Sequence, residues 1–171
     1  GRDDRLCFGP LGHQLQRQQH RRGRGVFGMG LAQQLQCTIG IARSQMDDEA
    51  FRTQFRDSLK EFAGTDAHGD EVAASLASRM YYVSGETDDA TLYQRLQARL
   101  TEIDGAEGVL FYLAIPPTVY ATVIEQLGAS GLADAPSRGW RRIVVEKPFG
   151  TDLDSARALN RLAHQHFDED Q

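Results

Sequence analysis

Cysteine, lysine and long apolar runs are all scarce in this chain of 171 residues. Two cysteines cannot build a disulfide framework or a cysteine-rich zinc site, so we expect a reducing compartment, the cytoplasm. No apolar run approaches the ~18 residues that a membrane span needs, and no segment has the pattern of a secretory signal. We therefore expect no membrane partner, and the length fits one domain.

Charge is unevenly distributed along the chain, whose net charge is −5. The first 36 residues carry six arginines against two aspartates, whereas residues 37–171 carry 13 basic against 22 acidic side chains. Because binding to nucleic-acid phosphates needs a basic face, this acidic body argues against a nucleic-acid partner. Two of the 19 basic residues are lysines, Lys60 and Lys147, and the histidines lack the spacing of a metal site.

Residues 1–36 differ in composition from the rest of the chain. The stretch 13–25 is rich in Gln, Arg and Gly and contains one apolar residue, so it cannot bury enough surface to offset the entropy of ordering. We predict that residues 1–36 form an atypical, poorly ordered segment. The alternative is a basic arm for RNA or an anionic surface, but no aromatic residues alternate with these arginines to stack on bases.

From Cys37 onward, short apolar runs alternate with segments of helical periodicity. This alternation predicts βαβ units and an α/β fold with a doubly wound parallel sheet over residues 37–171. The predicted strands are 37–42, 81–83, 109–115 and 143–145, and the predicted helices are 47–62, 70–80, 88–103, 117–127 and 152–166.

Ligands of parallel sheets bind beyond the carboxyl ends of the strands, which directs attention to the charged residues that follow two of the predicted strands. Arg43 directly follows the first predicted strand, where an arginine pairs with the 2′-phosphate of NADP and an acid would accept the ribose hydroxyls of NAD. Glu146 and Lys147 follow a buried strand, where a charged pair is costly unless it faces a cleft. The alternative for these positions is a solvated surface side chain.

Three stretches of the sequence resemble glucose-6-phosphate dehydrogenase: 82–89, 110–120 and 139–150, the last containing Glu-Lys-Pro-Phe-Gly. The resemblance runs from about residue 38 to residue 171. It implies a Rossmann-like NAD(P)-binding domain and the NADP-dependent oxidation of glucose 6-phosphate to 6-phosphogluconolactone, in the pentose phosphate pathway. It also implies a homo-oligomer for the full-length members of the family.

Residue by residue, the resemblance implies roles for six positions. Arg43 matches the arginine that holds the 2′-phosphate of NADP, and Lys147 matches the lysine that touches both substrate and cofactor. Pro148 matches a proline whose peptide geometry positions that lysine. The cofactor contacts implied in this way are Arg43, Glu86, Thr87, Tyr112 and Lys147.

The sequence departs from the family pattern near its start. The family has a Gly-x-x-Gly-Asp-Leu turn that cradles the pyrophosphate, whereas Gly9 and Gly12 are followed here by His-Gln. We hypothesise that residues 1–36 are a reading-frame artefact or a gene remnant, so the fold is expected to be incomplete at its N-terminal unit. Translating the coding DNA in its other frames tests this idea, because Gly-Asp-Leu followed by an amphipathic helix should appear there.

A second departure concerns the general base. The family's Arg-Ile-Asp-His-Tyr-Leu-Gly-Lys stretch, which supplies a histidine base, does not occur in these 171 residues. We expect His164 and His166 to lie on the surface at a helix end, so no catalytic residue is assigned. Lack of the base costs ~10²–10⁴-fold, and this chain alone is expected to be inactive. The alternative is a non-catalytic nucleotide-binding or interaction module derived from the domain.

Overall fold

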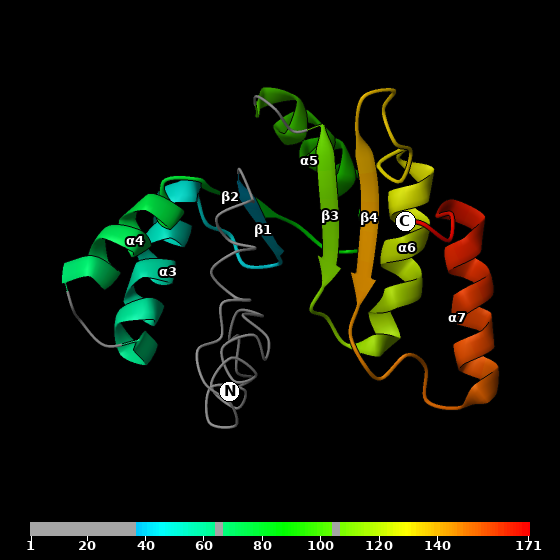
Figure 1. Cartoon of the computed structure of the whole chain (residues 1–171). Helices are drawn as coiled ribbons and strands as arrows, with labels where there is room; N and C mark the ends of the chain where they lie inside the picture. The colour runs from blue at the N-terminus through cyan, green and yellow to red at the C-terminus, as the bar shows by residue number, and fades with distance from the viewer. Residues whose placement is uncertain (1–36, 64–66, 104–106) are drawn as a thin grey trace. The chain divides into compact units, whose positions relative to one another are not determined.

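The computed structural model describes residues 37–63, 67–103 and 107–171 (Figure 1). The prediction for residues 1–36 lies outside this range. The chain divides into two compact units after Ser84, and each unit contains one pair of parallel strands. The predicted α/β class with parallel strands is confirmed, and no helix in the described ranges is both long and apolar enough to cross a membrane.

The first unit pairs strand β1 (Thr38–Ala42) in parallel with strand β2 (Met80–Ser84). Helix α3 (Asp48–Ala63) packs against β2 and against helix α4 (Ala67–Ala77). Aspartate and glutamate in the first turn of α3 and a lysine in its last turn complement the helix dipole. The core of this unit consists of Phe51, Met80 and Tyr82, with Ala42, Met46 and Phe55 packed against them.

Met80 shows where periodicity misassigned an element. We predicted a helix over 70–80 because Met80 continues the spacing of Val72 and Leu76. In the structure, α4 ends at Ala77 and the chain tightens through a bond from the Arg79 amide to the Leu76 carbonyl. Met80 then opens β2, where it is buried. A methionine four residues after a leucine fits a helix and a buried strand equally well, so spacing alone did not decide.

Gly40 in β1 leaves room for an aromatic ring from α3. A Cβ added to Gly40 would lie 2.4 Å from Cζ of Phe51, whose ring centroid is 5.1 Å from that of Tyr82. We therefore expect Gly40→Ala to lower the free energy of unfolding by about 1–3 kcal/mol, because the ring must move within a packed core. Urea unfolding followed by circular dichroism measures this change.

Two variants control this prediction. Thr38→Ala, at an exposed position of the same strand, should change the free energy of unfolding by less than about 0.5 kcal/mol. Combining Gly40→Ala with Phe51→Leu should cost less than the sum of the two single changes, since the smaller side chain makes room. A Gly40→Ala chain as stable as the original would show that Phe51 does not fill this space.

The second unit pairs strand β3 (Gly108–Leu113) in parallel with strand β4 (Trp140–Val145). The predicted strand over 109–115 is two residues too long. It ends at Leu113, opposite Val145, the last residue of β4. Consecutive prolines follow, and a short 3₁₀ turn, η1 (Pro117–Val119), leads into helix α6. Proline suits this first turn because its missing N–H is not needed there.

Three helices accompany these strands: α5 (Ala90–Glu102), α6 (Tyr120–Ala129) and α7 (Leu153–His166). Helix α6 contacts α5 and packs against α7, beside which it lies in Figure 1. Asp89 caps α5 by accepting a hydrogen bond from the Thr91 amide at 2.9 Å. Asp152 and Ser155 form a capping box at the start of α7. These caps confirm the predicted starts of both helices to within two residues.

Candidate functional site

Arg43 lies directly after β1, as predicted, and its side chain is exposed. The two residues that follow it are fixed by β2: the Tyr82 hydroxyl donates to the Ser44 carbonyl at 2.9 Å, and the Ser84 hydroxyl donates to the Gln45 side chain at 2.9 Å. Within the part of the chain that the structure describes, Arg43 makes no hydrogen bond or ion pair. Its guanidinium is therefore available to an anionic ligand on a held segment.

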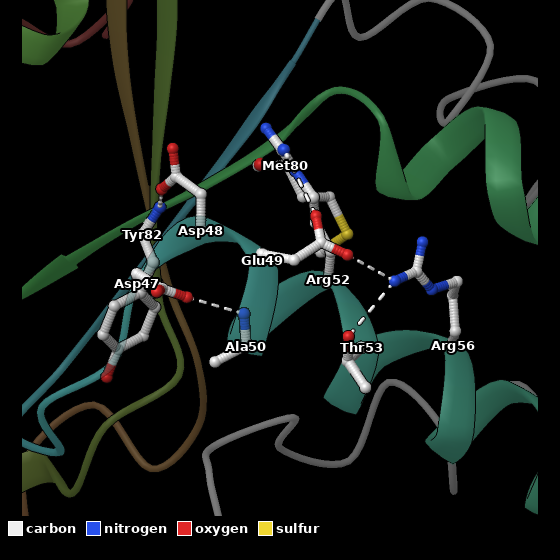
Figure 2. A network of polar contacts seen from close by, with 9 residues as sticks. All are labelled: Asp47, Asp48, Glu49, Ala50, Arg52, Thr53, Arg56, Met80 and Tyr82. Atoms are coloured by element: carbon white, nitrogen blue, oxygen red, sulfur yellow. Dashed lines mark hydrogen bonds and ion pairs between the residues drawn. The ribbon is translucent and has the colours of Figure 1, made fainter.

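Polar contacts also fix the neighbouring helix α3 to β2 (Figure 2). The Tyr82 amide donates to the Asp48 carboxylate at 2.7 Å, and Nε of Arg52 donates to the Met80 carbonyl at 2.9 Å. Each of these bonds joins a charged side chain to the main chain of β2, the kind of hydrogen bond that contributes most. Two further contacts in Figure 2 order α3 itself: Asp47 with the Ala50 amide, and Glu49 with Arg56.

Glu86 and Thr87 lie in the loop between β2 and α5, in the second unit. The Glu86 carbonyl accepts the Asp89 amide at 3.1 Å, and the Thr87 carbonyl accepts the hydroxyl of Tyr93 at 2.7 Å. Tyr93 is buried, and burial, with a smaller contribution from the charge of Asp88, raises its pKa to about 12. The hydroxyl stays protonated at neutral pH and holds the loop by donating its proton.

Tyr112, Glu146 and Tyr120 are joined by hydrogen bonds at the ends of β3 and β4. The Tyr112 hydroxyl donates to Oε1 of Glu146, and this bond, more than burial, raises the pKa of Tyr112 to about 12. The Tyr120 hydroxyl donates to the main-chain carbonyl of Glu146 at 3.2 Å. Two tyrosines thus hold Glu146, one by its carboxylate and one by its backbone.

Lys147 follows Glu146 on the loop after β4, and its side chain is exposed. Among the residues that the structure describes, no side chain or carbonyl accepts a hydrogen bond from its ammonium. The Lys147–Pro148 peptide bond is cis. At the far end of the loop, Gly150 has φ +85°, and a Cβ there would lie 2.6 Å from the Ala156 amide nitrogen. Only glycine fits this close approach to α7.

The structure brings some predicted site residues together and leaves others apart. Tyr112 is bonded to Glu146, the residue before Lys147, at the carboxyl ends of β3 and β4. The Glu86–Thr87 loop belongs to the same unit, whereas Arg43 belongs to the first unit.

Sequence reasoning noted Glu146 as part of a charged pair but gave it no role, and it missed Tyr120. The sequence signal for Glu146 was its charge directly after a buried strand; in the structure, Tyr112 pairs with Val144, and Glu146 shares the Val144 face two residues on. A diagonal contact from Tyr112 to Glu146 follows from that register. Tyr120 offered a weaker signal, as the aromatic residue that ends the Pro-Pro-Thr-Val-Tyr stretch.

The two C-terminal histidines differ in their surroundings. His164 is exposed, as predicted, and lies 3.2 Å from the Glu169 carboxylate. His166 is partly buried rather than on the surface, because Gly128 of α6 lacks a side chain and the imidazole packs against it. In the described ranges, no three His, Cys, Asp or Glu side chains gather as metal ligands.

The chain matches a family model described as "Glucose-6-phosphate dehydrogenase, NAD binding domain" over residues 26–171. The glucose-6-phosphate 1-dehydrogenase of Aggregatibacter actinomycetemcomitans is 39% identical over 137 residues, which cover 78% of this chain and 27% of that protein. A cytoplasmic glucose-6-phosphate 1-dehydrogenase of Arabidopsis thaliana is 36% identical over 140 residues, again 78% and 27%. The chain thus spans about a quarter of the length of these relatives.

Solved structures give the same result. The glucose-6-phosphate 1-dehydrogenase of Mycobacterium avium has a TM-score of 0.65 at 33% identity, over 77% of this chain and 27% of that one. A glucose-6-phosphate dehydrogenase in complex with glucose 6-phosphate has a TM-score of 0.64 at 32% identity, with the same coverage. The fold is therefore that of a Rossmann-like NAD-binding domain, which supports a nicotinamide dinucleotide cofactor.

Proposed function

The chain belongs to the glucose-6-phosphate dehydrogenase family, within its NAD-binding domain, and on that basis we propose that it binds NADP and serves the oxidation of glucose 6-phosphate. The product would be 6-phosphogluconolactone, with NADP as the hydride acceptor. The oxidation is proposed for a whole protein of the relatives' length, because the match covers 27% of the bacterial relative. A cytoplasmic location is proposed from the name of the plant relative.

The chemistry of each proposed site residue indicates which part of the ligand it would bind. Arg43 presents an exposed guanidinium without a partner among the described residues, which fits the 2′-phosphate that distinguishes NADP from NAD. Lys147 presents an ammonium that fits a phosphate or hydroxyl oxygen of either cofactor or substrate. Glu86 and Thr87 are proposed as further cofactor contacts, whereas the hydroxyl of Tyr112, which the resemblance also implies as a contact, is bonded to Glu146.

The observation that carries this proposal is the exposed Lys147, which follows the Glu146 carbonyl held by Tyr120 and makes no hydrogen bond to any residue that the structure describes. Isothermal titration calorimetry of the 171-residue chain with NADP tests it directly. We expect saturable binding that Lys147→Ala weakens and that Lys60→Ala, the same change at the other lysine, leaves unchanged. No heat of binding from a chain that circular dichroism shows to be folded would contradict the proposal.

A further inference from the structure

Glu146 places a carboxylate next to the lysine that the proposed function needs. Adjacent opposite charges on one loop attract each other, and an ammonium paired with its own neighbour is less available to a ligand anion. In the structure this carboxylate is bonded to the Tyr112 hydroxyl instead. The Tyr112 hydroxyl is a donor at neutral pH, and the bond to Glu146 raises its pKa further, to about 12.

The backbone of Glu146 is held independently of its side chain. Tyr120, the first residue of α6, has 1% of its surface exposed, so its ring is fixed by packing. Its hydroxyl donates to the Glu146 carbonyl, which belongs to the planar peptide group that also contains the Lys147 nitrogen. Fixing this peptide group fixes the point from which the Lys147 side chain starts.

We propose that Tyr112 acts on Lys147 through Glu146: it engages the Glu146 carboxylate, while Tyr120 holds the Glu146 carbonyl, and the Lys147 ammonium stays free for an anionic ligand. Tyr112 and Glu146 are positioning residues in this scheme. The proposal rests on the proposed function for the identity of the ligand, and it differs from a direct contact between Tyr112 and the cofactor.

Because the chain has two lysines, the surroundings of the Lys147 ammonium can be followed by NMR without any ligand. Reductive methylation with ¹³C-formaldehyde labels Lys60, Lys147 and the N-terminal amine, and keeps the lysine charge. Lys60→Arg assigns the two lysine signals in a ¹³C–¹H spectrum of the full chain. Lys60, at the end of α3 in the first unit, is the internal reference.

Four variants separate the possible roles. We expect Tyr112→Phe to move the Lys147 signal, because the released carboxylate turns to the ammonium. Glu146→Gln should leave the signal near its original position, and Tyr112→Phe with Glu146→Gln should restore it. Tyr93→Phe removes a tyrosine hydroxyl of the same unit that donates to the Thr87 carbonyl and not to Glu146, so it should not move the signal.

Two results would overturn the proposal. An unmoved Lys147 signal in Tyr112→Phe would show that Tyr112 does not act through Glu146. A large movement in Glu146→Gln alone would show that the carboxylate already pairs with Lys147, and this result needs no Tyr112 variant to fold.

A titration with NADP then follows on the same samples. We expect Tyr112→Phe to bind about two- to fivefold more weakly, the value of a competing surface ion pair, and the double variant to recover this loss. Failure of every variant and the original chain to bind NADP would refute the proposed function while leaving the ligand-free Lys147 result intact. Equal weakening in Tyr112→Phe and in the double variant would instead indicate a direct contact between Tyr112 and the cofactor.

Discussion

Replacing Arg43 with alanine is expected to raise the dissociation constant for NADP about 10- to 100-fold and to leave that for NAD within about twofold. A hydrogen bond to a charged group contributes about 1.5–3 kcal/mol, and NADP differs from NAD by the one phosphate that Arg43 is proposed to bind. Because the segment after Arg43 is fixed by Tyr82 and Ser84, the guanidinium starts from an ordered position. Calorimetric titrations of Arg43→Ala with both dinucleotides measure the ratio.

Two variants make this measurement specific. Arg138→Ala removes the same charge from an exposed position of the second unit and should leave the preference for NADP intact. Arg43→Lys keeps the charge but loses the two-pronged geometry of the guanidinium, so it should recover part of the preference. An unchanged NADP-to-NAD ratio in Arg43→Ala would remove Arg43 from the proposed site.

The strands and most helices followed from local patterns because each is an apolar run or an amphipathic stripe with its own boundary residues. Asp89 and Asp152 are examples, since a helix start can be predicted from a capping side chain alone. The assignment of Met80 to a helix was wrong because its spacing fits both a helix and a strand. The pairing of Met80 with Thr38 shows that it belongs to a strand.

Site residues could be assigned from the sequence where one short motif carries them, but contacts between two distant segments could not. The resemblance assigned roles to Lys147 and Pro148 from a single short motif, and the peptide bond between them is cis in the structure. The bond from Tyr112 to Glu146 joins residues 34 positions apart and depends on the register of β3 against β4. Parallel strands are joined by a crossover connection, whose length can be read from the sequence. The register in which the two strands pair cannot be read from it.

The stability of the second unit depends strongly on one side chain of α6. Ile124 is 0% exposed, and its truncation in Ile124→Ala leaves a cavity that a packed interior closes incompletely. We expect the free energy of unfolding to fall by about 2–5 kcal/mol, a large share of the 5–15 kcal/mol of a typical domain. The single tryptophan, Trp140 in β4 of the same unit, reports urea unfolding by its fluorescence.

Glu125→Ala, at the exposed neighbouring position, should change the free energy of unfolding by less than about 0.5 kcal/mol. A loss below about 1 kcal/mol in Ile124→Ala would mean that α6 does not anchor this unit, and that Tyr120, at the start of the same helix, is not held firmly enough to fix Glu146.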